Sequence, residues 1–303
     1  MPLVTTDDGV QLYYEEAGSG SPMIFVHEFA GDHRSWEPQI RFFSRRYRCI
    51  VYSARGYPPS DVPGQGANYS QERVWQDLRC VMDALNIQQA HVVGLSMGAF
   101  ACLHFGMHHG TQGQASRALS LTLAGCGTGS HPAVHEEFKA QSKVLAQDIE
   151  TLGAEHLANT YGMGPSRLQF KAKDPRGYNE FNRNLAEHSP QGSARTSRGY
   201  QGERPSLYNL TDAISAINVP TLIMTGDEDE PCLEPSLMLK RAINTSVLAV
   251  LPGSGHAINL EEPQLFNQLL AEFLAQVEQG KDFVRPVETR PATIWGPGGD
   301  PRR

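Results

Sequence analysis

The stretch Ala90-His91-Val92-Val93-Gly94-Leu95-Ser96-Met97-Gly98 decides the fold of this chain. Its first part is a short apolar run, typical of a strand buried in a parallel sheet, and residues 97–108 have helical spacing. The chain must therefore turn from strand to helix around Ser96, which is the context that the G-x-S-x-G pattern requires. Glycines two residues before and after the serine avoid clashes in such a tight turn. The Ser96 hydroxyl is predicted to stand clear of the sheet at a helix N-terminus, which favours developing negative charge.

Similar apolar runs recur along the chain and alternate with segments of helical spacing. An alternating strand is predicted first, at residues 10–16, and the buried runs follow at 23–26, 49–52, 92–95, 119–123, 221–224 and 247–251. Helical spacing is found at 35–46, 70–85, 97–108 and 261–277. This order predicts an α/β fold with a doubly wound, mostly parallel sheet.

One long segment interrupts the alternation. Between residues 127 and 214 there is no strong buried-strand run, although residues 133–152 have helical character. We therefore predict a core domain of residues 1–126 and 215–279, with a mainly helical cap of residues 127–214 inserted into it. The second half of the cap is expected to be mobile or held by specific contacts. Residues 280–303 are rich in proline, glycine and charge, and predict an extended C-terminal tail.

A serine nucleophile needs a base, and His256 is the best placed of the eleven histidines. It lies on the glycine-rich loop Pro252-Gly253-Ser254-Gly255-His256, directly after the last apolar run. A histidine there can reach over the carboxyl edge of the sheet, where ligands bind in open α/β sheets.

The histidine in turn needs a carboxylate to orient it. The loop Gly226-Asp227-Glu228-Asp229-Glu230 offers several candidates after the strand at 221–224. Asp229 is the first choice because the loop should have turned back over the sheet by that residue, and Asp227 is the second. The resulting chain order is Ser96, Asp229, His256.

Taken together, these motifs resemble the α/β-hydrolase fold superfamily over residues 5–279, in particular its small esterases and cofactor-free haloperoxidase-like enzymes. The matching segments are F-V-H-E-F-A-G (25–31), Y-S-A-R-G-Y-P-P-S-D (52–61), G-L-S-M-G-A (94–99), L-I-M-T-G-D-E-D (222–229) and P-G-S-G-H-A-I-N-L-E-E-P (252–263). The Ser, Asp, His order is also that of the superfamily. The resemblance implies an oxyanion hole made by the backbone N–H groups of Met97 and Phe29.

The chain departs from the family pattern at the rim of the expected site. His27 is followed by Glu28 where the family usually has glycine, which brings a carboxylate near the mouth. Glu28 is expected to face solvent or to pair with Arg34 or Arg55; the alternative is that it repels anionic substrates or positions water. His27 is expected to organise the oxyanion loop rather than to transfer protons.

Composition narrows the partners. The chain has 303 residues and a net charge of −7, so binding to a polyanion such as nucleic acid is not expected. No apolar run approaches the roughly 20 residues that span a bilayer, and no signal peptide is visible, so a cytoplasmic protein without a membrane partner is predicted. The five cysteines form no C-x-x-C pair and are expected to be buried free thiols. We predict that the protein needs no cofactor and no metal. Its expected partner is a small-molecule substrate, and the sequence is compatible with a homo-oligomer.

The sequence thus predicts a serine hydrolase that cleaves carboxylic esters of small or medium, uncharged substrates through an acyl-enzyme. Two alternatives stay open. The same triad could hydrolyse a carbon–carbon bond of a carboxylated dione, recognised by basic residues of the cap: Arg167, Lys171, Lys173, Arg176 and Arg183. The chain could also be a non-catalytic ligand receptor of the same fold.

Overall fold

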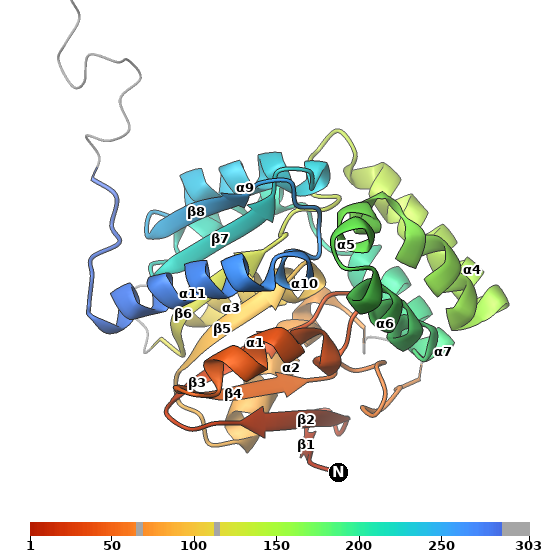
Figure 1. Cartoon of the computed structure of the whole chain (residues 1–303), viewed down its shortest axis with the longest axis horizontal. Helices are drawn as coiled ribbons and strands as arrows, with labels where there is room; N and C mark the ends of the chain where they lie inside the picture. Colours follow the sequence, from red (N-terminus) through yellow and green to blue (C-terminus); the bar gives the residue numbers. More distant parts are fainter. Residues whose placement is uncertain (65–68, 112–115, 287–303) are drawn as a thin grey trace, which may run out of the picture.

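A computed structural model describes residues 1–64, 69–111 and 116–286, and these residues form an eight-stranded sheet (Figure 1). The strand order is β1-β2-β4-β3-β5-β6-β7-β8. The first two strands pair antiparallel with their neighbours, and every pair from β4 to β8 is parallel. The predicted doubly wound, mostly parallel sheet is confirmed. The strands are β1 (Leu3–Thr5), β2 (Gln11–Ala17), β3 (Ser21–Val26), β4 (Tyr47–Tyr52), β5 (Ala90–Leu95), β6 (Ala118–Ala124), β7 (Thr221–Gly226) and β8 (Ser246–Leu251).

Helices cover both faces of this sheet. Helices α2 (Gln71–Ala84), α3 (Met97–His109) and α9 (Glu230–Ala242) pack on one face, whereas α1 (Glu37–Phe43) and α11 (Pro263–Glu278) pack on the other. The short helix α10 (Ile258–Glu261) precedes α11, and the 3-10 turn η1 (His33–Trp36) precedes α1. The hydroxyl of Ser70 accepts the backbone N–H of Arg73 at 3.1 Å and so caps α2.

The two helical layers explain why the strands are continuous apolar runs. Along β3, Met23 and Phe25 belong to the core cluster that includes Phe266 of α11. Ile24 and Val26 alternate with them and face the opposite core cluster, which contains α2 and α3. Because side chains of a strand point to alternate faces, a strand covered on both sides must be apolar at every position.

The segment between β6 and β7, described in full, contains helices joined by turns and loops, and it has no strand. Figure 1 shows it gathered at the end of the sheet where the parallel strands finish. It contains α4 (His135–Thr160), α5 (Leu168–Lys173), α6 (Pro175–Ala186), α7 (Pro190–Arg195) and α8 (Thr211–Ser215). The short turns η2 (Tyr161–Met163), η3 (Pro165–Arg167) and η5 (Leu207–Leu210) and the π-helical turn η4 (Thr196–Gln201) connect them. We call this segment the cap.

Specific contacts hold the second half of the cap. Arg198 forms two hydrogen bonds of 2.7 Å with Glu150 of α4, and the Ser197 hydroxyl donates to the Ser142 carbonyl at 2.8 Å. Helix α4 itself bends at Gly153, whose φ of 85° and ψ of 179° are open to glycine but strained for other residues. Of the two states expected for this half of the cap, the structure has the one held by contacts.

The chain after α11 is described only as far as residue 286. Phe283 packs against Phe273 with ring centroids 5.4 Å apart, so the start of the predicted tail lies on the core. Residues 287–303 of that tail lie outside the described residues. Within the described ranges, no helix combines the length and the apolar character needed to cross a membrane. The five cysteines are all buried and free, as the sequence predicts.

Candidate active site

Ser96 occupies the turn between β5 and α3 with a φ of 53° and a ψ of −115°. Non-glycine residues rarely adopt a positive φ, and close packing enforces it here. A Cβ atom at Gly94 would lie 2.3 Å from the Gly98 carbonyl oxygen, and one at Gly98 would lie 2.0 Å from the Val26 carbonyl oxygen. The Ser96 N–H donates to the Ala124 carbonyl of β6 at 2.8 Å. The two glycines of the motif are therefore required for the turn to fit.

The structure brings His256 and Asp229 together. The Nδ1 atom of His256, on the loop after β8, lies 2.7 Å from Oδ2 of Asp229, on the loop after β7. The two loops approach closely because Gly226 faces the Ser254 carbonyl, which a Cβ atom would meet at 2.0 Å. Because Nδ1 is engaged by the carboxylate, Nε2 is the nitrogen left to face the cavity.

Asp229 and His256 stabilise each other's charged forms. Burial acts to raise the pKa of Asp229, but the adjacent His256 outweighs it and holds that pKa below its ordinary value. Burial acts to lower the pKa of His256, but the charge and hydrogen bond of Asp229 raise it above its ordinary value. The pair is thus suited to stabilise an imidazolium formed during proton transfer.

Asp227, the second candidate carboxylate, lies elsewhere. Its side chain is exposed and accepts the Ser254 N–H at 3.1 Å, so it braces the histidine loop without touching the imidazole. Asp229 is buried, with 4% of its surface exposed. The geometry therefore favours Asp229 over Asp227 as the residue that orients His256.

His27 fixes the loop expected to supply an oxyanion donor. Its Nδ1 lies 2.7 Å from the Glu28 carbonyl oxygen, and its Nε2 accepts the Ala54 N–H at 3.0 Å, which together assign the tautomer protonated at Nδ1. Burial lowers the pKa of His27 to about 4, so the ring is neutral. The Phe29 N–H belongs to the same trans peptide as the Glu28 carbonyl and points the opposite way. His27 therefore sets the direction of the Phe29 N–H.

The Glu28 side chain is neither exposed nor paired with Arg34 or Arg55, so that sequence-based expectation is wrong. Glu28 is 1% exposed and forms a buried ion pair with Arg167 of the cap. Arg34 instead pairs with Asp32 and Glu187, and Arg55 with Asp8 and Asp77. Burial acts to lower the pKa of Arg167, but Glu28 raises it above its ordinary value. The carboxylate is thus neutralised inside the protein and is not a charge at the mouth.

Met97 is held by the cap. Its carbonyl oxygen accepts the Tyr200 hydroxyl at 2.7 Å, and Tyr200 lies in the π-helical turn η4. The Met97 N–H opens helix α3, where backbone N–H groups have no partner within the helix. From the other side, the hydroxyl of Tyr57 donates to the Phe29 carbonyl at 3.0 Å. Both expected oxyanion donors therefore lie on backbone fixed by buried tyrosines.

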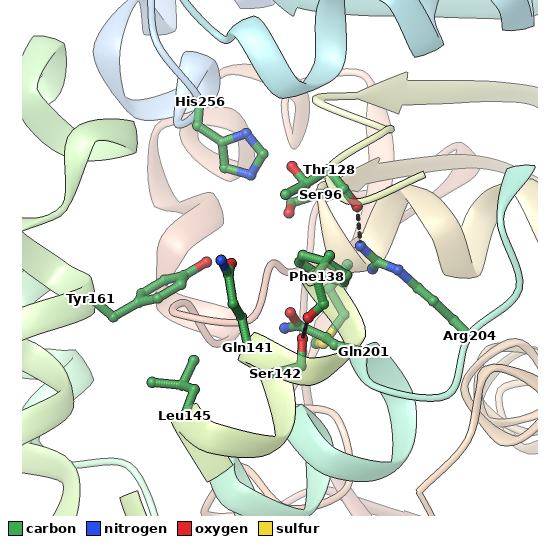
Figure 2. Close-up of a pocket in the computed structure, with 11 residues that line it drawn as sticks. Ser96, Thr128, Phe138, Gln141, Ser142, Leu145, Tyr161, Gln201, Arg204 and His256 are labelled. Carbon is green, nitrogen blue, oxygen red and sulfur yellow. Dashed lines mark hydrogen bonds between the residues drawn. The ribbon is translucent and has the colours of Figure 1, made fainter. Parts of the chain in front are cut away.

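Ser96 and His256 face a shared cavity of about 220 Å³ between core and cap. Figure 2 shows the His256 ring directed toward Ser96, with Tyr161, Gln141 and Leu145 on the cap side. Its wall mixes polar and apolar side chains: Ser96, Met97, Thr128, Phe138, Gln141, Ser142, Leu145, Tyr161, Gln201, Arg204 and His256.

Seven apolar and aromatic side chains of the cap lie in three different environments. Phe138, Leu145 and Tyr161 line the cavity. Leu157 and Phe181 are buried in the core of the cap instead, while Leu152 and Met163 are exposed. The basic cap residues of the carbon–carbon hydrolase alternative, Arg167, Lys171, Lys173, Arg176 and Arg183, do not line it.

Several residues of the site escaped the sequence analysis, and two of them, Cys232 and Arg204, carry chemistry of their own. Cys232 of α9 places its Sγ 4.0 Å from His256 Nδ1, and with Asp229 these form a cluster whose ligand atoms lie within 4.8 Å of one another. Such a cluster could hold a soft metal ion, but the 2.7 Å contact between Asp229 and His256 already engages both groups. Arg204 lines the cavity from the end of the cap. Only its position in the fold, and no local motif, reveals its role.

Comparisons with known proteins agree with this architecture. A family model described as the alpha/beta hydrolase fold matches residues 21–263. The 3-oxoadipate enol-lactonase 1 of Acinetobacter baylyi is 26% identical over 287 residues, which cover 91% of this chain and 97% of that protein. A non-heme haloperoxidase of Rhodococcus erythropolis is also 26% identical, over 90% of this chain and 99% of its own length.

Solved structures share the fold. A thermophilic esterase from Thermogutta terrifontis superposes with a TM-score of 0.76 at 24% identity, covering 91% of this chain and 98% of that one. At this identity the likeness establishes the architecture, and the family model establishes the lineage over most of the sequence. The chain belongs to the alpha/beta hydrolase fold family, as its motifs indicate.

Proposed function

We propose that this protein is a serine hydrolase that cleaves carboxylic esters or lactones through an acyl-enzyme. The observation that carries the proposal is the contact of 2.7 Å between His256 and Asp229, beside a cavity that Ser96 also lines. A buried histidine oriented by a carboxylate, next to a serine on a strained strand-to-helix turn, is the arrangement that activates a hydroxyl.

The reaction would proceed in two steps. The Ser96 Oγ attacks the ester carbonyl carbon while Nε2 of His256 takes the hydroxyl proton. His256 then gives this proton to the leaving alcohol as the carbon–oxygen bond of the ester breaks. A water molecule, deprotonated by the same nitrogen, attacks the acyl carbon. The bond from that carbon to Ser96 Oγ breaks, His256 returns the proton to Oγ, and the acid leaves. Asp229 keeps the imidazole in the required tautomer throughout.

The negative oxygen of each tetrahedral intermediate would bind the N–H groups of Met97 and Phe29. The Phe29 donor is oriented in advance, because His27 holds the Glu28 carbonyl of the same peptide. The Met97 donor is fixed by its place at the start of α3. Loss of one such donor costs about 3–4 kcal/mol of transition-state stabilisation in other serine hydrolases.

Cavity size supports small or medium substrates. A volume of about 220 Å³ is below the range of roughly 300–1,000 Å³ for drug-sized ligands. The names of two similar proteins, an enol-lactonase and an esterase, support hydrolysis of lactones or esters. The expectation of uncharged substrates rested on an exposed Glu28, and the buried pair with Arg167 removes that argument.

A substrate panel tests the proposal. Purified protein and its Ser96→Ala variant are assayed with p-nitrophenyl esters of rising chain length, with lactones, and with a carboxylated dione. We expect turnover of short esters or lactones that is abolished in Ser96→Ala. Turnover of the dione alone would replace the proposal with carbon–carbon bond hydrolysis, and acylation of Ser96 without turnover would support the receptor alternative.

A further inference from the structure

Arg204 contributes a buried positive charge to the cavity that holds Ser96 and His256. Its side chain is 5% exposed, and it lies between the turns η4 and η5. Figure 2 shows its guanidinium reaching toward Thr128, whose carbonyl accepts a hydrogen bond from Nη2, on the side of the cavity where Ser96 lies.

This charge has no carboxylate partner among the residues that the structure describes. Three arginines there are buried: Arg55, Arg167 and Arg204. Arg55 pairs with Asp8 and Asp77, and Arg167 pairs with Glu28. Arginine is almost never fully buried unless it is paired, because the loss of water is costly for a charged group. Arg204 is the exception that needs explaining.

Aromatic rings hold the guanidinium but do not use its donors. Arg204 lies 3.8 Å above the Phe100 ring and 4.9 Å from the Phe138 ring, measured from Cζ to the centroids. Stacking of this kind stabilises the cation and fixes its plane. A guanidinium has five N–H donors in a fixed fork. Among the described residues, Arg204 donates to one acceptor, the Thr128 carbonyl. The remaining donors are available to a ligand in the cavity.

The cavity wall contains no aspartate or glutamate, and the nearby Glu28 is neutralised by Arg167. We propose that Arg204 is the counter-ion for a carboxylate on the substrate, so that the natural substrate is a small ester or lactone bearing an anionic group. This proposal rests on the serine hydrolase function proposed above and specifies its substrate class. The bidentate geometry of arginine suits a carboxylate, and the small cavity keeps that carboxylate near the reacting carbonyl.

A matched pair of substrates tests the assignment. The mono-p-nitrophenyl ester of adipic acid carries a carboxylate, and the p-nitrophenyl ester of adipic acid monoamide has nearly the same shape without the charge. We expect kcat/KM of the native protein to favour the carboxylate by about tenfold or more, since a charge-assisted hydrogen bond contributes that much. The ratio of kcat/KM for the two esters does not depend on the concentration of active enzyme.

Variants show whether Arg204 is the residue that reads the carboxylate. In Arg204→Met the ratio is expected to fall to about one, whereas Arg204→Lys keeps the charge but not the fork and should give an intermediate ratio. The control is Arg183→Met, which removes the same charge from an exposed cap position and should keep the native ratio. Fluorophosphonate labelling of Ser96 reports whether each variant has a folded site.

The outcomes separate the two proposals. A native ratio of one or less, or a native ratio retained in Arg204→Met, overturns the role of Arg204 while leaving ester hydrolysis intact. If neither ester is hydrolysed and Ser96 is not labelled, the serine hydrolase function fails, and the substrate class fails with it. If Arg204→Met does not fold, the kcat/KM ratios of the native protein and of Arg204→Lys test the role of Arg204. A lower ratio in Arg204→Lys supports that role, and an equal ratio overturns it.

Discussion

The residue that most constrains this site is Ser96, because its backbone conformation is unfavourable by itself. A non-glycine residue in such a region costs on the order of 1–3 kcal/mol and persists only where its surroundings impose it. Here the hydrogen bond to Ala124 and the close approach of Gly94 and Gly98 impose it. The strained residue is the one that lines the cavity beside His256.

The choice between two carboxylates is a prediction at this scale. Asp229→Asn should lower kcat by roughly 10⁴, the loss that the equivalent change causes in chymotrypsin-like proteases, because an amide favours the wrong tautomer of His256. Asp227→Asn, its matched control, should lose little, since Asp227 is exposed and contacts only a backbone N–H. Steady-state kinetics on a neutral ester measure both. Equal losses in the two variants would show that Asp229 is not the orienting residue.

The dependence of activity on pH follows from the same pair. His256 must be neutral to act as a base, so activity is present above its pKa and is lost as pH falls through it. Burial and the charge of Arg167 act to lower this pKa, but Asp229 and Glu28 raise it by more. The acid limb of kcat/KM should therefore have its midpoint above the ordinary value of 6.5. A neutral ester keeps substrate ionisation out of the profile.

An independent titration checks that midpoint. The His256 ring can be followed by NMR in the Ser96→Ala variant, which keeps Asp229, Cys232, Glu28 and Arg167 around it. The NMR pKa should lie above 6.5, like the kinetic midpoint. A midpoint below 6.5 by either method would mean that burial outweighs the Asp229 interaction.

At the scale of elements, the buried pair of Glu28 and Arg167 links the loop after β3 to turn η3 of the cap. Removing one partner leaves the other charged and buried, so Glu28→Met or Arg167→Met should each lower the free energy of unfolding by about 3–5 kcal/mol. The double variant should recover much of this loss. Urea denaturation followed by circular dichroism measures all three.

An exposed ion pair provides the control. Arg34 and Glu187 also join core to cap at 2.7 Å, but Glu187 is 64% exposed. Glu187→Gln should therefore change stability by less than about 1 kcal/mol. A Glu28→Met loss no larger than this would contradict the view that the buried pair holds the cap on the core.

Elements also show how far sequence reasoning reaches. Each of the strands from β3 to β8 contains a short run of mostly apolar residues, so these six strands could be predicted from local sequence alone. Strand β1 escaped because it is three residues long and buries only Val4. Helix α9 escaped because Pro231 and Pro235 obscure its helical pattern, although Pro231 lies in the first turn, where proline is tolerated.

At the scale of the whole molecule, site residues could be predicted where a local sequence pattern places them, but not where they depend on contacts between distant segments. Ser96, Asp229 and His256 could be proposed because each directly follows a predicted strand, and parallel strands end at one edge of the sheet. The partner of Glu28 could not be proposed, because Arg167 lies 139 residues away and meets it only when the cap folds over the core. Arg204 was missed for the same reason, since no local pattern marks a buried arginine without a carboxylate.

The cap and the core together enclose the cavity, and the proposal depends above all on Ser96 being the nucleophile in it. The most direct measurement is mass spectrometry of the intact protein and its peptides after reaction with a fluorophosphonate. We predict one adduct per chain, located on Ser96, absent in Ser96→Ala and formed far more slowly in His256→Ala. An adduct on another serine, together with ester hydrolysis that persists in Ser96→Ala, would contradict the account.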